Sequence, residues 1–349
     1  MTVQELPAIP ELVSRRDDVR AYYSGRSVLV TGGAGFIGSN LARTLVALGA
    51  KVTVLDNLAP NYGGNRFNLG GVELRFIEGD QTDQREMAKL VRDFDSVFNM
   101  VGQVSHVDSM EDPLTDLRTN VMTHIGLLEA LRKERPDVKV VFAGTRGQYG
   151  RTAGLVDESA HIAPIDVNGI NKHAGETYHF VYARAYGLRV TSLRLTNTYG
   201  PRHTMRTARQ GVLAWFVRQA LDGQAIRLFD GGEQLRDCNH VSDVVAALLI
   251  AMVSPAADGE VFNLGSKKPI SLREIAQTIV AQAKSGSVTN VPYPPHLKSI
   301  EIGDYVGDYT KAHRVLGWEP AIDLARGMAD TVEYYREHRE HYWTHEAYP

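Results

Sequence analysis

The sequence has a single cysteine, Cys238, and no apolar run that approaches the roughly 18 residues of a membrane span. One cysteine excludes an internal disulfide framework and a cysteine-rich zinc site, and we expect no bound metal. The formal net charge is only −3, so neither nucleic acid nor an anionic membrane is favoured as a partner. The first residues include acids and lack an apolar core, so we expect no export signal. These absences predict a cytoplasmic protein.

What the sequence does contain is a glycine-rich turn. Gly32, Gly35 and Gly38 lie between a short apolar strand at 27–30 and an amphipathic helix at 40–47. Glycines at this spacing let the backbone turn sharply and approach a pyrophosphate, and the helix then offers unpaired N–H groups to the phosphates. We therefore predict a dinucleotide site, with Gly32, Gly35, Phe36, Ile37 and Gly38 in contact with the cofactor.

An acid follows the next strand. Residues 51–55 are predicted to form a second strand and are followed by Asp56 and Asn57, about 20 residues beyond the glycines, where a ribose-binding acid is expected. A carboxylate there accepts hydrogen bonds from ribose hydroxyls and repels a 2′-phosphate. Because no arginine follows Asp56 immediately, the pattern predicts NAD rather than NADP.

The order of the elements predicts an α/β fold. Strands alternate with helices from residue 27 to 195, which is typical of a doubly wound parallel Rossmann sheet. Beyond residue 199 short strands mix with helices, which indicates a smaller, interleaved substrate lobe. We expect an N-terminal extension at 1–25 packed outside the core, an NAD-binding domain at 26–199 and a lobe at 200–349. Residues 240–255 are expected to return to the NAD-binding domain.

Several segments together resemble one known family, the extended short-chain dehydrogenase/reductases, and within it the nucleotide-sugar epimerases and dehydratases. The resemblance covers about residues 22–340 and rests on segments 31–38, 55–58, 79–80, 120–121, 148–150, 171–172, 193–201, 236–243 and 316–320. It implies NAD as cofactor and a nucleotide-diphosphate sugar as substrate. It also implies a homodimer formed through helices at about 119–132 and 171–186, although the apolar faces of these helices could instead be buried within one monomer.

The resemblance adds further cofactor contacts. Asp80 and Gln81 match the family segment that holds the adenine, although Asp80 could also simply cap its loop. Residues 100–103 match the turn that passes beneath the riboses. The expected contacts in that turn are Met100, Val101, Gly102 and Gln103.

By the same resemblance, three residues lie at the reaction centre. Thr145 matches the Ser or Thr that hydrogen-bonds the reacting sugar hydroxyl, although it could merely cap the loop after its strand. Lys172 matches the catalytic lysine, which bridges the hydroxyls of the nicotinamide ribose. Asn168 falls where the family has the tyrosine that acts as general acid and base. An amide cannot ionise near neutral pH, so Asn168 is the sharpest departure from the family pattern.

Three explanations of Asn168 stay open. Another group could take the proton: Lys172 with a lowered pKa, His106, Tyr149, or a water held by Asn168. The reaction could also tolerate a weaker base, or the protein could bind cofactor and sugar without turnover. His106 and Tyr149 could equally be ordinary packed loop residues.

The residues after Thr145 bear on the reaction. In the family, 4,6-dehydratases carry an acidic pair there and decarboxylating relatives use a nearby glutamate, whereas this chain has Arg146 and Gly147. A 4-epimerase needs only hydride removal, rotation of the keto sugar and hydride return, so we predict an NAD-dependent 4-epimerase. The alternatives are a dehydratase with non-standard acid/base residues and a catalytically silent binding protein. Arg146 could bind an acidic group on the sugar or face solvent.

The second part of the chain supplies the expected diphosphate contacts. Asn197 matches a residue near the sugar–pyrophosphate junction. Arg236 matches the arginine that binds the diphosphate, for which a planar, permanently charged fork is suited, although it could instead pair with Asp237 or Asp243. The full set expected at the substrate is His106, Thr145, Tyr149, Asn197 and Arg236.

Overall fold

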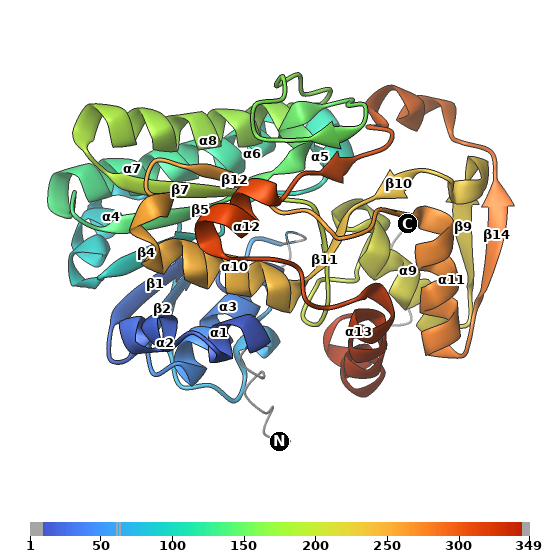
Figure 1. Cartoon of the computed structure of the whole chain (residues 1–349), viewed down its shortest axis with the longest axis horizontal. Coiled ribbons are helices and arrows are strands. Elements are labelled where there is room, and N and C mark those ends of the chain that lie inside the picture. Colours follow the sequence, from blue (N-terminus) through green and yellow to red (C-terminus); the bar gives the residue numbers. More distant parts are fainter. Residues whose placement is uncertain (1–9, 61, 63, 344–349) are drawn as a thin grey trace.

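The computed structural model describes residues 10–60, 62 and 64–343, and is built on a seven-stranded sheet (Figure 1). The strand order is β12-β7-β5-β4-β1-β2-β3, and every neighbouring pair is parallel. The strands are β1 (Ser27–Thr31), β2 (Lys51–Asp56), β3 (Arg75–Glu78), β4 (Ser96–Asn99), β5 (Lys139–Thr145), β7 (Arg189–Leu195) and β12 (Val261–Asn263). The predicted doubly wound α/β fold is confirmed.

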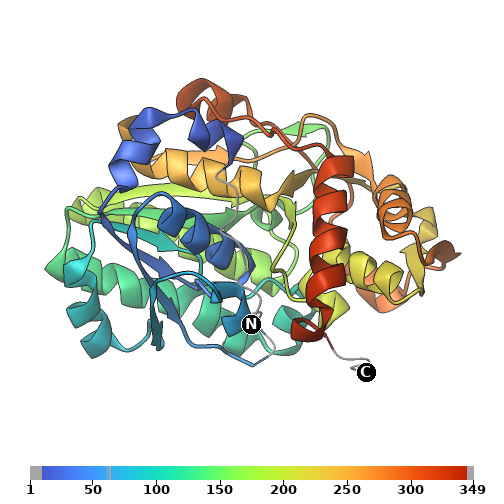
Figure 2. The same cartoon turned by 90° about the horizontal axis from the view of Figure 1, so that it is seen from below.

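Helices cover both faces of this sheet (Figures 1 and 2). One face is covered by the helices α4 (Gln84–Leu90), α7 (Thr123–Glu134) and α8 (Val167–Tyr186). The other face is covered by α3 (Phe36–Ala47) and α10 (Val241–Val253). Side chains of β1 alternate between the two layers, because successive strand residues point to opposite faces. Val28 and Val30 join the core under α3 and α10, whereas Leu29 joins the core under α4 and α7.

Two helix boundaries differ from the sequence-based expectation, and both changes affect the site. Helix α8 begins at Val167 rather than near 171, because Asp166 caps it by accepting a hydrogen bond from the Gly169 N–H. The helix expected from 119 starts instead as a π-helical turn, η3 (Arg118–Met122), which continues into α7. Both Asn168 and Lys172 are therefore on one rigid helix.

The described part of the N-terminal segment does not pack outside the core, so that prediction is wrong. Helices α1 (Glu11–Ser14) and α2 (Asp17–Tyr23) bury Val13, Val19 and Tyr23 completely. The Tyr23 hydroxyl donates a hydrogen bond to the Leu249 carbonyl of α10 at 2.9 Å. An apolar stripe within a polar segment brings these helices onto α10. Residues 1–9 of the expected extension lie outside the described residues.

The lobe has its own core between α9 (Val212–Leu221), α11 (Leu272–Ala283), α13 (Leu324–His338) and the pair β9 (Ala225–Phe229) and β14 (Ser287–Val291). Figure 2 shows the red helix α13 between the sheet and the rest of the lobe. The chain returns to the sheet through α10, within the expected 240–255, and again through β12 and α12 (Thr310–Leu316). The range 200–349 is thus shared between lobe and sheet.

The remaining elements are short and mostly connect these layers. They are α5 (His106–Glu111), α6 (Pro113–Leu117), β6 (Leu155–Val156), β8 (Asn197–Tyr199), β10 (Leu235–Arg236), β11 (Cys238–His240), β13 (Ile270–Ser271) and β15 (Val306–Gly307). Within the described residues, none of the helices combines the length and the apolar character required to cross a bilayer. The same residues contain no cluster of three His, Cys, Asp or Glu side chains able to hold a metal ion.

Candidate functional site

The glycine turn between β1 and α3 is shaped by close backbone contacts. A Cβ on Gly38 would lie 2.3 Å from the Gly32 carbonyl oxygen, and one on Gly32 would lie 2.9 Å from the Met100 carbonyl carbon. Gly32 also has a φ of +66°, which side chains disfavour. A side chain at Gly38 would therefore clash within the turn, and one at Gly32 would push the turn away from the loop after β4.

This turn forms the floor of a cavity of about 340 Å³ at the carboxyl ends of β1, β2 and β4. Gly35 caps α3 without a side chain, so the first N–H groups of the helix face the cavity. Apart from Lys172, every residue expected to bind the cofactor lines it. These are Gly32, Gly35, Phe36, Ile37, Gly38, Asp56, Asn57, Asp80, Gln81, Met100, Val101, Gly102 and Gln103.

Asp56 ties the glycine turn to β2. Its Oδ2 accepts a hydrogen bond from the Ala34 N–H at 3.0 Å, and its Oδ1 accepts one from the Leu58 N–H at 2.9 Å. Burial raises the pKa of Asp56, although the two backbone N–H groups act in the opposite direction. Each carboxylate oxygen keeps a lone pair, so the group can still accept from ribose hydroxyls at the cavity edge.

Asp80 and Gln81 line the same cavity and follow β3, whose last residue, Glu78, pairs with Asp56. Asp80 does cap its loop, since its Oδ1 accepts from both the N–H and the hydroxyl of Thr82 at 2.8 Å. Gln81 donates to the Thr123 carbonyl, and its buried Oε1 has no hydrogen-bond partner among the described residues. An orphaned acceptor in the wall fits a ligand with an amino group, such as adenine. The helix N–H groups, the Asp56 carboxylate and the open Gln81 Oε1 of this cavity therefore fit a dinucleotide.

A second cavity of about 460 Å³ opens beside the first, between the sheet and the lobe. The two cavities share wall residues, including Phe36, Met100, Gly102 and Gln103. A ligand in one can therefore touch a ligand in the other. Six of the residues expected at the reaction centre or the substrate line this second cavity: His106, Thr145, Asn168, Lys172, Asn197 and Arg236.

Thr145 and Lys172 both line the second cavity, and the Lys172 Nζ lies next to Gly102, a residue that borders both cavities. Thr145 ends β5, and its Oγ1 accepts from the Gly147 N–H at 3.1 Å, so it caps the following turn as well as lining the cavity. The Lys172 ammonium donates to the Ala143 carbonyl at 3.0 Å. Burial lowers the pKa of Lys172 to about 8, although Asp116 and Glu176 partly offset this effect. A largely buried ammonium beside Gly102 is suited to ribose hydroxyls or to a nearby developing anion.

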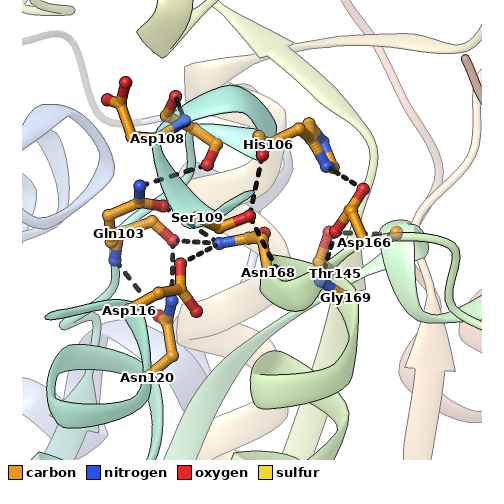
Figure 3. A network of polar contacts seen from close by, with 12 residues as sticks. Gln103, His106, Asp108, Ser109, Asp116, Asn120, Thr145, Asp166, Asn168 and Gly169 are labelled. Atoms are coloured by element: carbon orange, nitrogen blue, oxygen red, sulfur yellow. Dashed lines mark hydrogen bonds and ion pairs between the residues drawn. The ribbon is translucent and has the colours of Figure 1, made fainter. Parts of the chain in front are cut away.

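Asn168 is held in a buried hydrogen-bond network (Figure 3). Its Nδ2 donates toward the Gln103 carbonyl at 2.8 Å, the Gln103 Oε1 at 3.0 Å and the Asp116 Oδ2 at 3.0 Å. Its backbone N–H donates to Ser109 Oγ at 3.1 Å. Asn168 thus connects α8 to α5, α6 and the loop after β4. A tyrosine hydroxyl has one hydrogen to donate and could not replace the several contacts of the Asn168 NH₂ group.

His106 faces the second cavity from the start of α5. Its Nδ1 lies 2.6 Å from the Asp166 Oδ2, and the side chain is 45% exposed. Burial raises the pKa of Asp166, but the hydrogen bond and the charge of His106 outweigh burial, so the net pKa of Asp166 is lowered. Figure 3 shows this pair beside Thr145, at the N-terminus of α8.

Tyr149 is not at the cavity, so its expected contact with substrate is not supported. Its hydroxyl donates to Asn263 Oδ1 at 2.8 Å and accepts from Arg194 Nη1 at 2.6 Å. The side chain is 1% exposed and packs with Tyr305. The alternative of an ordinary packed residue therefore describes Tyr149, because the turn after Thr145 directs it toward β7 and β12.

The far end of the second cavity is basic. Arg236 pairs with Glu301 at 2.9 Å rather than with Asp237 or Asp243, and it also donates to the Gly303 carbonyl at 2.6 Å. Arg146 does not face solvent: its Nη1 is buried with no hydrogen-bond partner among the described residues. Burial, together with Arg236, lowers the pKa of Arg146 to about 10. Two close guanidinium groups, one with an open donor, suit an anionic ligand.

Asn197 adds a further open donor to the same wall. It lies on β8, and its buried Nδ2 has no hydrogen-bond partner among the described residues. Sequence reasoning missed two residues of this region. Asp166 could have been found as an N-cap signal before an apolar-periodic helix, whereas nothing local marks Glu301 as the partner of Arg236.

Comparison with known proteins agrees with this geometry. A sequence model described as the NAD dependent epimerase/dehydratase family matches residues 28–265. The chain is 34% identical to UDP-glucose 4-epimerase of Mycolicibacterium smegmatis, with 88% of this chain and 98% of the relative covered. It is 32% identical to dTDP-glucose 4,6-dehydratase of Streptomyces niveus, with 89% and 93% covered.

A solved structure shows the same overall arrangement. The UDP-glucose 4-epimerase of Thermotoga maritima, crystallised with UDP-glucose, superposes with a TM-score of 0.82 at 34% identity. The comparison covers 90% of this chain and 99% of that one. The relatives matched are named for different reactions, so the similarity shows the family and the fold but does not decide the reaction.

Proposed function

The chain belongs to the NAD-dependent epimerase/dehydratase family, and we propose that it is a nucleotide-sugar 4-epimerase. In this proposal the sugar C4 hydroxyl is oxidised transiently and then restored with either configuration. Such a reaction would place the protein in carbohydrate biosynthesis. When bound, NAD supplies a hydride acceptor that can also return the hydride.

The residues that line the second cavity have distinct proposed tasks. Thr145 orients the C4 hydroxyl through its own hydroxyl, which both donates and accepts. Lys172 holds the nicotinamide ribose and stabilises negative charge that develops nearby. Arg236, with Asn197, binds the diphosphate at the basic end of the second cavity. Asn168 fixes the frame around them and takes no proton.

The acid content of the second cavity is the observation that favours epimerisation over dehydration. Among the residues that line it, Glu301 is the one carboxylate, and Glu301 is paired with Arg236 and hydrogen-bonded to Tyr293. Loss of water from the sugar needs groups that move protons at neighbouring carbons. Beside Thr145 the wall offers Arg146 instead of an acid. Of the two reactions, 4-epimerisation needs fewer proton-transfer groups at this site.

The test is incubation of the purified protein with NAD and a panel of uridine, thymidine, guanosine and cytidine diphosphate sugars, followed by proton NMR. We expect one sugar nucleotide to interconvert with its C4 epimer. A stable 4-keto or unsaturated product would instead identify a dehydratase. Tight binding of sugar nucleotides with no change in any of them would identify a silent binding protein.

We also propose that the protein is a homodimer. Apolar side chains that are exposed in the single chain gather on the outer surface of α6, η3 and α8. They are Leu114, Leu117, Met122, Ile170, Tyr178 and Val181. Monomers rarely expose a contiguous apolar face of this kind. Packing α6, η3 and α8 of one subunit against those of a second copy would cover it.

A further inference from the structure

The proposed reaction requires a group that takes the C4 hydroxyl proton, and Asn168 cannot do so. Its Nδ2 is engaged by Gln103 and Asp116 in the interior. Tyr149 is buried away from the cavity. Lys172 lines the cavity, but its ammonium is already directed at the Ala143 carbonyl. A different ionisable side chain must face the sugar.

His106 is fixed in a geometry that suits this task. Its Nδ1 lies 2.6 Å from Asp166 Oδ2, and Asp166 is only 4% exposed. The second oxygen of Asp166 accepts the Gly169 N–H at 2.7 Å, which locks the carboxylate onto the first turn of α8. A carboxylate at Nδ1 holds the ring proton there, so the neutral ring presents the Nε2 lone pair.

The ring also lies close to Thr145. A Cβ placed on Gly147 would be 3.4 Å from Thr145 Oγ1 and 3.5 Å from His106 Cε1, so both groups border one small space. His106 lines the second cavity, and its Nε2 has no hydrogen-bond partner among the described residues. A hydroxyl oriented by Thr145 in that space is within reach of the free ring nitrogen.

The surroundings of His106 support a reversible change in its charge. Asp166 is the acid that faces it from α8, and Arg146 lies near enough to Asp166 to interact with it through charge. On its own helix, Asp108 is paired with Arg209 of the loop before α9. One ionised carboxylate in direct contact can therefore stabilise an imidazolium.

We propose that His106, held by Asp166, is the proton acceptor and donor of the reaction in place of the family's tyrosine; this rests on the proposed function. As the hydride leaves C4, the hydroxyl O–H bond breaks and its proton forms an N–H bond at Nε2. The electron pair of the broken O–H bond becomes the second C–O bond of the ketone. When C4 regains its hydride, the same proton returns from Nε2 to oxygen, so nothing is consumed.

The decisive variant is His106→Gln, which keeps a polar side chain but cannot accept a proton. We expect kcat to fall by roughly 10²- to 10⁴-fold, because the general base is lost. Calorimetry should show affinities for the sugar nucleotide and for NAD within about threefold of wild type, which would indicate an intact site. His161→Gln, at an exposed histidine on the loop before α8, is the matched control and should leave turnover unchanged.

Asp166→Asn tests the orientation of the ring. Asparagine can still cap α8, but its amide donates to Nδ1 and so moves the ring proton to Nε2. We expect nitrogen NMR of histidine-labelled wild type to show neutral His106 protonated at Nδ1, and the variant to show it at Nε2. The variant's kcat should fall by at least roughly tenfold, consistent with a wrong tautomer.

The outcomes separate the two proposals. If the wild type interconverts a sugar nucleotide and His106→Gln retains nearly full kcat, the role of His106 is refuted and the epimerase remains. A wild-type ring protonated at Nε2 would refute it as well, because that nitrogen could not accept. If the wild type converts no sugar nucleotide, the proposed function fails and the role of His106 fails with it.

Discussion

The two cavities are built from different materials. The dinucleotide cavity is shaped mainly by backbone: glycines at tight contacts, a helix N-terminus, and Asp56 anchored by two N–H groups. The substrate cavity is shaped by side chains that reach across the fold, such as Asn168 to Asp116 and His106 to Asp166. A backbone site tolerates little substitution, whereas a side-chain site can exchange its chemistry while keeping its shape.

The largest effect should come from the backbone site. In Gly38→Val the new Cβ would meet the Gly32 carbonyl at 2.3 Å, so the turn cannot keep its shape. We expect NAD affinity to fall by at least roughly 100-fold, since the phosphate contacts depend on close backbone approach. Calorimetry measures the NAD affinity. Gly70→Ala is the control, because a Cβ there would lie 3.3 Å from its nearest contact. An equal loss of NAD affinity in both variants would contradict the view that the close backbone contacts of the glycine turn shape this cavity.

We expect Lys172→Met to lower catalytic activity without lowering the stability of the fold. Lys172→Met should lower kcat by roughly 10²-fold or more, because it removes the buried cation at the reaction centre. The lysine pKa falls from 10.5 unfolded to about 8 folded, so its burial costs on the order of 3 kcal/mol at pH 7. The variant should therefore be at least as stable as wild type at pH 7 by urea unfolding.

The pH dependence gives the sign of this effect. Between pH 8 and 10.5 the unfolded state binds more protons at Lys172 than the folded state, so wild-type stability gains from this group as pH rises. Any advantage of Lys172→Met should shrink across that window. A variant less stable than wild type at pH 7, with the same loss at pH 10, would show that burial of the charge is not costly.

Asp56 should show a smaller effect, confined to the cofactor. Asp56→Ala removes the ribose acceptor and two backbone contacts, and we expect roughly a tenfold loss of NAD affinity with a reduced preference over NADP. Fluorescence titration with both nucleotides measures it. Lys51→Ala, at the exposed start of the same strand and outside both cavities, should change neither affinity.

The smallest expected effect on turnover concerns the outer surface behind the substrate cavity. Leu114 is 75% exposed on α6, the helix that also carries Asp116 of the Asn168 network. Leu114→Lys should shift the protein from dimer to monomer in light scattering, with at most a few-fold change in kcat, an order-of-magnitude expectation for a remote surface site. A wild-type monomer at all concentrations would refute the dimer.

The sequence predicted the backbone site well because its signals are local. The glycine spacing, the two strands that flank the first helix and the acid after β2 all lie within residues 27–56. The substrate cavity was predicted less well. The partners of His106 and Arg236 are 60 and 65 residues away in the sequence, and Tyr149 turns inward although its neighbour Thr145 lines the cavity. Contacts between residues so far apart in the sequence depend on tertiary packing, which the spacing of residues in a motif does not predict.

The chain crosses repeatedly between sheet and lobe. It passes into the lobe after β8, returns through α10 and β12, leaves for α11 and β14, and comes back through α12 before α13. No single cut would release the lobe as an independent piece. We therefore expect the molecule to melt in one cooperative transition, and new sugar specificities to arise by substitutions in the cleft rather than by exchange of a whole module.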